Sequence, residues 1–119
     1  VKTHNLTITN NDPTAHAEVT AIREACASAG NFKLEECDLY TSCEPCPMCL
    51  AAAYWAGIRK IYYGNTKADA AEIGFDDSFI YDEMELPPTE RRVQAVGMLR
   101  NEALEAFRMW CNKLDKVEY

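Results

Sequence analysis

The sequence predicts an α/β domain in which helices and strands pack in layers. Segments rich in β-branched and aromatic residues alternate with segments of helical periodicity, in the order strand, helix, strand, helix, strand, helix. The chain has 119 residues, of which 48% are hydrophobic and 26% charged, and this suits one domain with a modest core. We therefore expect residues 1–119 to form a single domain.

The first segments predict a strand and a long helix. Val1 to Thr9 alternates weakly between apolar and polar side chains, which indicates a strand. A cluster of turn residues follows, in which we expect Asp12 to cap a helix that begins at Pro13. Apolar residues recur at helical spacing along this helix, and Gly30 ends it.

The middle of the chain is organised around a turn rich in thiols, Cys43-Glu44-Pro45-Cys46-Pro47-Met48-Cys49. Asp38 to Ser42, just before this turn, is a strand candidate. The apolar residues after the turn predict a helix that Gly57 ends. Pro45 and Pro47 suit the entry of that helix, because a missing backbone N–H costs nothing there.

The remaining segments extend the alternation. Arg59 to Gly64 is β-branched and aromatic, hence a strand, and Thr66 to Glu72 is expected to be helical. Phe75 to Glu85 is acidic and predicted to be irregular, and no element is assigned to residues 91–99. We expect Asn101 to cap a last helix. Its apolar side consists of Ala103, Leu104, Phe107, Trp110, Cys111 and Leu114.

The net charge of −7 bears on whether the partner is a nucleic acid or a small molecule. Proteins that bind a polyphosphate backbone gather Lys and Arg on one surface, whereas the adjacent cations Arg91 and Arg92 lie beside Glu90. This charge disfavours nucleic acid and suits a small uncharged substrate. No apolar run approaches the length of a membrane span, and no signal-peptide pattern opens the chain. We expect no membrane association.

The six cysteines predict a reducing compartment. Three of them crowd into the thiol turn, while Cys26, Cys37 and Cys111 lie in otherwise regular apolar segments, as buried free thiols do. Three disulfides in a small secreted domain are the alternative. A cytoplasmic protein with a metal-binding subset of thiols fits the pattern better.

Two of the crowded thiols are candidate metal ligands. Cys46 and Cys49 are three residues apart at the start of a helix, where the positive end of the helix dipole favours thiolates. His16 lies at the start of the first helix, and helix N-termini in layered α/β folds gather at the carboxyl ends of the strands. Ligands of type N, S and S match zinc, and three protein ligands leave the open position of a catalytic site.

Cys43 and Glu18 bear on the type of site. If Cys43 also bound the metal, the site would be closed and structural, and this remains an alternative. Glu18 lies two residues after His16, so both side chains reach one metal only if the metal lies near the end of the helix. In that place we expect Glu18 to carry the proton of an activated water.

Two motifs in the right order resemble a known family. His16-Ala17-Glu18 followed by Pro45-Cys46-Pro47-Met48-Cys49 resembles the H-x-E and P-C-x-x-C pair of the zinc-dependent nucleoside and nucleobase deaminases. Gly74-Phe75-Asp76-Asp77-Ser78 and the closing Val117-Glu118-Tyr119 are similar to the bacterial guanine deaminases of the cytidine-deaminase fold. The resemblance implies a three-layer α/β/α fold, a mixed sheet with helices on both faces. The N-terminal helix and first strand of that fold are expected to be missing from the numbered sequence.

The resemblance also implies an activity. It is the zinc-dependent hydrolysis of guanine to xanthine and ammonia, with His16, Cys46 and Cys49 as zinc ligands and Glu18 as the proton carrier. Alternatives within the superfamily are deamination of another base, of a nucleoside such as guanosine, or of adenosine in tRNA, which the acidic charge disfavours. A structural zinc module with Cys43 as fourth ligand is the alternative from another class.

Three further residues are implied as contacts of the purine substrate. Asn5 matches a family position that hydrogen-bonds the base, and Asp77 matches an acidic position suited to the N–H donors of guanine. Tyr119 is expected to reach the pocket of a neighbouring subunit in a homodimer that exchanges its C-terminal segments.

Overall fold

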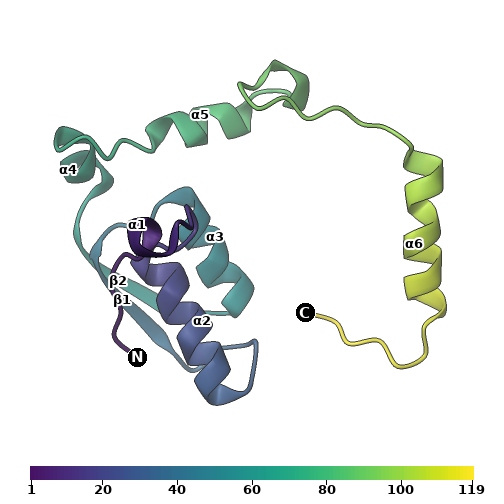
Figure 1. Cartoon of the computed structure of the whole chain (residues 1–119), viewed down its shortest axis with the longest axis horizontal. Helices are drawn as coiled ribbons and strands as arrows, with labels where there is room; N and C mark the ends of the chain where they lie inside the picture. The colour runs from purple at the N-terminus through teal and green to yellow at the C-terminus, as the bar shows by residue number, and fades with distance from the viewer. The chain divides into compact units, whose positions relative to one another are not determined.

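The computed structural model describes residues 1–119, which divide into two compact units, Val1–Tyr81 and Asp82–Tyr119. Each unit is described by itself. In chain order the elements are α1 (Thr7–Asn10), α2 (Ala17–Ala29), β1 (Asp38–Cys43), α3 (Pro47–Ala56), β2 (Lys60–Asn65), α4 (Lys67–Glu72), α5 (Ser78–Glu85), the 3-10 turn η1 (Pro88–Glu90) and α6 (Arg100–Asn112) (Figure 1). The predicted α/β class is confirmed.

The sheet of the first unit consists of β1 and β2, which run parallel. Parallel neighbours need a crossover connection, and α3 supplies it. The register pairs Asp38 with Lys60 at one end and Cys43 with Asn65 at the other. The sheet is smaller than the mixed sheet that the resemblance implies, because it holds these two parallel strands alone.

The core of the first unit is formed by α2, α3 and one face of β1. The helices α2 and α3 pack against each other, and Figure 1 shows them side by side. Small side chains on α3 allow this close approach. The buried apolar residues are Ala15, Val19, Leu34, Leu39, Cys49, Ala53 and Ala56. Cys49 is therefore both a core residue and a candidate ligand.

The opposite face of the sheet carries aromatic side chains. Tyr40 and Tyr62 lie side by side on paired strands, with their ring centroids 4.8 Å apart and nearly parallel. Since alternate residues of a strand point to opposite faces, Leu39 in the core and Tyr40 on the surface fix which way β1 is turned.

The N-terminal segment differs from the prediction. No strand forms over Val1 to Thr9, and Thr7–Asn10 is a short helix instead. The physical reason is local: Asn5 Oδ1 accepts a hydrogen bond from the backbone N–H of Thr7 at 2.9 Å, which favours a turn over an extended chain.

The start of α2 also differs. The helix begins at Ala17 rather than Pro13, with His16 as the residue that precedes its first turn. Asp12 does not cap the helix, because its carboxylate accepts hydrogen bonds from Thr14 in the preceding turn. The predicted end is confirmed: Gly30 adopts φ of 62°, a left-handed conformation that glycine takes without strain.

The second unit contains the end of α5, the 3-10 turn and α6. The prediction of an irregular segment up to Glu85 was wrong, since Asp76 Oδ1 accepts from the backbone N–H of Ser78 at 2.9 Å and a helix follows. Asn101 does not cap the last helix, which begins one residue earlier after Leu99. No residue of this unit is buried. None of the helices in either unit has the length and apolar character that a membrane span requires.

Candidate metal centre

Two helix entries bring three potential ligands together. His16 and Cys46 occupy the same position, the extended residue immediately before α2 and α3 respectively, and Cys49 lies in the first turn of α3. His16 Nδ1 is 3.6 Å from Cys46 Sγ and 3.6 Å from Cys49 Sγ. The three ligand atoms all lie within 4.8 Å of one another. The carboxyl end of β1 leads directly into this point, as the sequence predicts.

The spacing of these atoms suits zinc. A zinc ion about 2.3 Å from sulfur and about 2.0 Å from nitrogen, with tetrahedral angles, holds the two atoms roughly 3.6 Å apart. This is the separation between His16 Nδ1 and each of the two sulfurs. One imidazole and two thiols are also a donor set that zinc prefers. The residues therefore fit the metal.

The two thiols share one proton. The hydrogen bond that Cys49 donates lowers the pKa of the Cys46 thiol to about 6, and His16 and the backbone N–H groups at the start of α3 act in the same direction. The same hydrogen bond, burial and the Glu18 carboxylate raise the pKa of Cys49. The thiolate form of Cys46 is thus favoured, and a thiolate attracts a cation.

Glu18 faces this cluster from the first turn of α2. Its Oε2 lies 3.5 Å from Cys49 Sγ, and its Oε1 lies 3.4 Å from Thr41 Oγ1 on β1. Because His16 precedes the helix and Glu18 is its second residue, both side chains reach the same point despite a spacing of two. The cluster therefore lies near the end of the helix, as is expected if His16 and Glu18 are to reach the same metal.

Thr41 is a contact of Glu18 that the sequence analysis did not assign. The signal was present in the alternation of β1: the face that places Leu39 in the core also carries Thr41 toward α2. A polar residue on that face, two positions beyond a buried one, needs a polar partner. Glu18 and the Cys43 carbonyl are its partners.

Cys43 lies outside the cluster. Its Sγ is 4.0 Å from the Thr66 carbonyl oxygen, and it is not among the side chains whose ligand atoms converge. Burial and the negative charge of Glu18 raise the pKa of its thiol. Because its sulfur lies against this carbonyl and not among the converging ligand atoms, Cys43 is not a candidate ligand in this arrangement.

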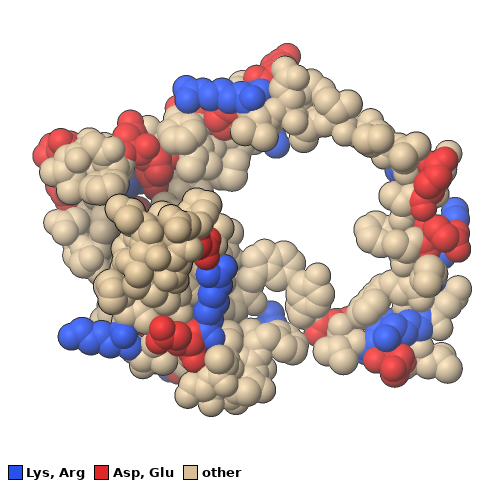
Figure 2. All heavy atoms as spheres, viewed as in Figure 1, with Lys and Arg blue, Asp and Glu red and all other residues tan.

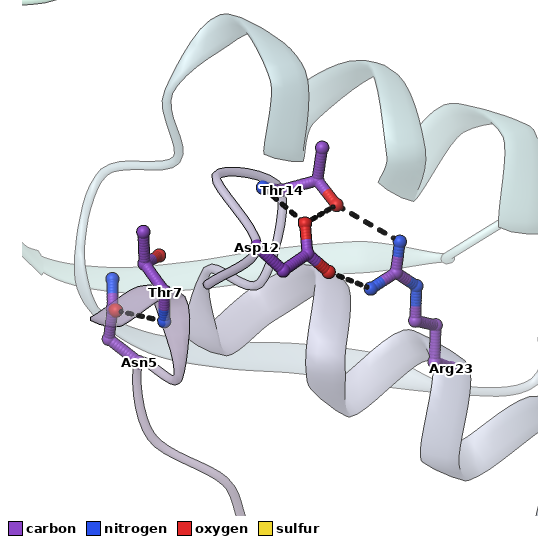
Figure 3. A network of polar contacts seen from close by, with 5 residues as sticks. All are labelled: Asn5, Thr7, Asp12, Thr14 and Arg23. Atoms are coloured by element: carbon purple, nitrogen blue, oxygen red, sulfur yellow. Dashed lines mark hydrogen bonds and ion pairs between the residues drawn. The ribbon is translucent and has the colours of Figure 1, made fainter. Parts of the chain in front are cut away.

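A network of polar side chains fastens the turn before His16. Asp12 Oδ1 accepts from the Thr14 backbone N–H at 2.8 Å and from the Thr14 hydroxyl at 2.7 Å. Arg23 on α2 donates to Asp12 Oδ2 at 3.3 Å and to Thr14 Oγ1 at 3.1 Å. Figure 3 shows its guanidinium turned toward both residues of the turn. The backbone that carries His16 is thereby tied to its own helix.

Residues 1–65 match the family model of the cytidine and deoxycytidylate deaminase zinc-binding region. Over 111 residues the chain is 54% identical to the guanine deaminase of Bacillus subtilis (strain 168), which covers 93% of this chain and 71% of that protein. The chain belongs to this zinc-binding deaminase family. The resemblance that the two motifs indicate is confirmed.

Solved structures agree with this membership. The X-ray structure of guanine deaminase from Bacillus subtilis matches with a TM-score of 0.95 at 52% identity, over 98% of this chain and 74% of that chain. A tRNA:A34 deaminase structure matches with a TM-score of 0.55 at 38% identity, over 76% of this chain and 67% of that one. In sequence, the tRNA-specific adenosine deaminase of Agrobacterium fabrum is 50% identical over 66 residues, 54% of this chain and 43% of that protein. The predicted cytidine-deaminase-like fold is confirmed.

In this deaminase chain, Asn5 lies next to the backbone that carries His16. The N–H of Leu6 donates to the Ala15 carbonyl at 2.9 Å, which brings the N-terminal segment alongside the turn. Asn5 is exposed, and its Oδ1 is occupied by the Thr7 backbone N–H (Figure 3). Its Nδ2 is left to donate.

The other two predicted contacts lie in different units. Asp77 is half-buried before α5 in the first unit, and its charge contributes to the raised pKa of Cys43, after burial and the charge of Glu18. This places its carboxylate within electrostatic reach of the thiol turn. Tyr119 belongs to the second unit and is 81% exposed. The first unit alone therefore holds six of the seven predicted site residues, His16, Cys46, Cys49, Glu18, Asn5 and Asp77.

Proposed function

We propose that this member of the zinc-binding deaminase family hydrolyses guanine to xanthine and ammonia. The observation that carries the proposal is the Glu18 carboxylate 3.5 Å from a thiol of a His, Cys, Cys cluster with zinc-like spacing. The substrate rests on the 54% identity to the guanine deaminase of Bacillus subtilis over 93% of this chain. Residues 1–119 are proposed to act as one deaminase domain.

In the proposed reaction Glu18 moves the protons. His16, Cys46 and Cys49 would hold a zinc ion, which when bound would supply the Lewis-acid chemistry that makes water a nucleophile near neutral pH. Glu18 accepts a proton from the attacking water at Oε2, the oxygen that faces the cluster, while the water oxygen bonds to the carbon that bears the amine. It passes this proton to a ring nitrogen next to that carbon. It then carries the remaining hydroxyl proton to the amine, so that the C–N bond breaks and ammonia leaves.

The proposed substrate contacts have complementary polarity. Asn5 donates from Nδ2 to an acceptor of the base, since its Oδ1 is already bound to Thr7. The Asp77 carboxylate accepts from the N–H donors that guanine presents. A site that pairs an acceptor with those donors rejects bases that lack them, because the carboxylate would then be left without a partner.

We further propose that the active form is a homodimer that exchanges C-terminal segments, so that Tyr119 of one subunit completes the pocket of the other. The support is the second unit, in which Phe107, Met109 and Trp110 of α6 are 71%, 68% and 40% exposed. A second copy of the chain would cover these side chains. All six cysteines are free, in keeping with the proposed cytoplasmic location, but Cys37 and Cys111 are exposed rather than buried as the sequence predicts.

A tRNA substrate is the second candidate, because tRNA-specific adenosine deaminases are among the relatives. The charge argues against it. The face in Figure 2 shows Lys and Arg dispersed among Asp and Glu rather than gathered in a patch. Cations of the first unit are also engaged: Arg23 pairs with Asp12 and Arg59 with Asp38. Phosphate binding needs clustered free cations.

The experiment that tests the proposal is an ammonia-release assay on the purified chain loaded with zinc. Guanine, guanosine, cytosine, adenine and an anticodon stem-loop RNA are compared at equal concentration. We expect guanine to have the highest kcat/KM. A higher kcat/KM for another substrate contradicts guanine as the substrate. No turnover of any of them at full zinc content, with Glu18→Gln behaving identically, supports the structural zinc module instead.

A further inference from the structure

The Glu18 carboxylate is flanked by side chains of two different elements. Oε2 faces Cys49 Sγ of α3 at 3.5 Å, and Oε1 faces Thr41 Oγ1 of β1 at 3.4 Å. Glu18 and Thr41 are both half-buried, so water competes less for their contact than it does on the open surface. The carboxylate thus has one oxygen on the metal side and one on the sheet side.

Thr41 has a second polar neighbour. Its Oγ1 lies 3.0 Å from the Cys43 carbonyl oxygen. A threonine hydroxyl donates one hydrogen and accepts through its lone pairs. It can therefore donate its one hydrogen to Glu18 Oε1 or to the Cys43 carbonyl oxygen, both of which lie within reach.

The sheet fixes where this hydroxyl lies. Thr41 pairs with Tyr63 in the β1–β2 register, and Leu39 on the same face is buried in the core. A β-branched side chain on a paired strand has little freedom at χ1. Glu18, by contrast, is a long side chain in the first turn of a helix, and it needs a partner to hold it in one rotamer.

We propose that Thr41 is a positioning residue for Glu18: its hydroxyl holds Oε1 on the β1 side, so that Oε2 stays turned toward the metal ligands. The inference rests on the proposed deaminase function, in which Glu18 moves protons. Thr41 donates its hydroxyl hydrogen to Oε1 and thereby keeps the carboxylate between the strand and the ligand cluster.

The test compares Thr41→Val, which keeps the branched shape and loses the hydroxyl, with Thr41→Ser, which keeps the hydroxyl. In the zinc-loaded full chain we expect Thr41→Val to lower kcat for guanine roughly tenfold, as for the loss of one hydrogen bond to a charged group. We expect KM and zinc content to stay unchanged, because the hydroxyl is bonded to Glu18 and the Cys43 carbonyl and is not among the converging ligand atoms. Thr41→Ser retains kcat within about twofold. Thr89→Val, the same change at an exposed residue of the 3-10 turn, is the matched control and leaves kcat unchanged.

Two kinetic results overturn the inference. One is a kcat of Thr41→Val equal to that of the unmodified chain at full zinc content. The other is an equal loss in Thr41→Ser, because the hydroxyl would then not be the group that matters. If Thr41→Val fails to hold zinc, Thr41→Ala removes the same hydroxyl with less bulk and is judged by the same criteria.

A crystal structure of zinc-loaded Thr41→Val gives a readout that does not depend on turnover. We expect the Glu18 carboxylate to leave the position next to residue 41, and an unchanged rotamer overturns the inference. If the unmodified chain does not deaminate guanine, the proposed function fails, while this comparison of structures still decides whether Thr41 positions Glu18.

Discussion

The two units of the chain differ in what they bury. In Val1–Tyr81 a small core of α2, α3 and β1 includes Cys49, which is 0% exposed and is also a candidate ligand. In Asp82–Tyr119 no residue is buried, and α6 leaves large apolar side chains in contact with solvent. The first unit therefore has its own hydrophobic core, whereas the apolar side chains of the second unit remain exposed to solvent.

This difference indicates that the two units have different roles. The metal ligands lie on elements that fix one another through packing, so the cluster depends on the first unit. The second unit has an amphipathic helix but no core, and a segment of this size without a core is marginal by itself. We therefore expect changes in the first unit to alter metal binding and chemistry, and changes in the second to alter association.

The largest effect is expected from Glu18→Gln, which tests whether the first unit carries the chemistry. Turnover of guanine falls by about 10³-fold because the amide cannot accept and return a proton. Zinc content and Tm are retained, since Glu18 is not a ligand. Rates are measured beside metal analysis. Glu24→Gln, at an exposed position of the same helix, is the control and keeps full activity. Substantial residual turnover in Glu18→Gln would contradict the assigned role.

The next effect is expected from Cys49→Ala, which removes a ligand and a core side chain together. We expect zinc content to fall to near zero and Tm to drop by roughly 10 °C, because metal binding is coupled to folding. Chelation of zinc from the unmodified chain lowers Tm in the same direction. Cys43→Ala retains full zinc content, as does Cys37→Ala at an exposed thiol. Loss of zinc in Cys43→Ala would show a closed site.

The next effect is expected from Phe107→Glu in α6, which should alter association and leave the metal centre intact. The charge cannot be covered by a second copy of the chain, so light scattering should show a shift from dimer to monomer. Zinc content stays unchanged, because the ligands lie in the first unit. Glu105→Gln, on the same helix, is the control. Loss of zinc in Phe107→Glu would contradict the expectation that changes in the second unit leave metal binding unaffected.

The smallest effect is expected from glycine substitutions. Gly57 ends α3 with φ of 71°, and an added Cβ would lie 3.1 Å from Glu35 Cγ. Gly57→Ala should cost about 1–2 kcal/mol and lower Tm by a few degrees, as measured by thermal unfolding. Gly97 in the second unit has neither a positive φ nor a neighbour within 4 Å, so Gly97→Ala leaves Tm unchanged. Equal changes in Tm at both positions would argue against a core that is confined to the first unit.

The same contrast explains what could be predicted from the sequence. The helices α2 and α3 end at Gly30 and Gly57 as predicted, and β1 and β2 are recognisable from their composition, because packing and local preference agree there. The ligand cluster is predictable because both helix entries follow from turn residues and strand ends. Periodicity and motif spacing carry that information in the chain itself.

Other features depend on contacts that sequence periodicity does not encode. Asn5 and Asp76 each accept a backbone N–H and start a helix where alternation or acidity suggested otherwise. Asp12 bonds to Thr14 and leaves the position before α2 to His16. Thr41 acquires its partner only through tertiary packing of β1 beside α2. In each case the difference goes with side-chain hydrogen bonds that the periodicity of the sequence does not encode.

X-ray absorption at the zinc edge of the loaded chain tests most directly whether the metal centre keeps an open position. We predict two sulfur ligands at about 2.3 Å and two lighter ligands at about 2.0 Å, which are the imidazole of His16 and solvent. The solvent ligand should exchange when a purine analogue binds. A third sulfur in the spectrum, from Cys43, would show a closed structural site and contradict the account of this protein as a deaminase.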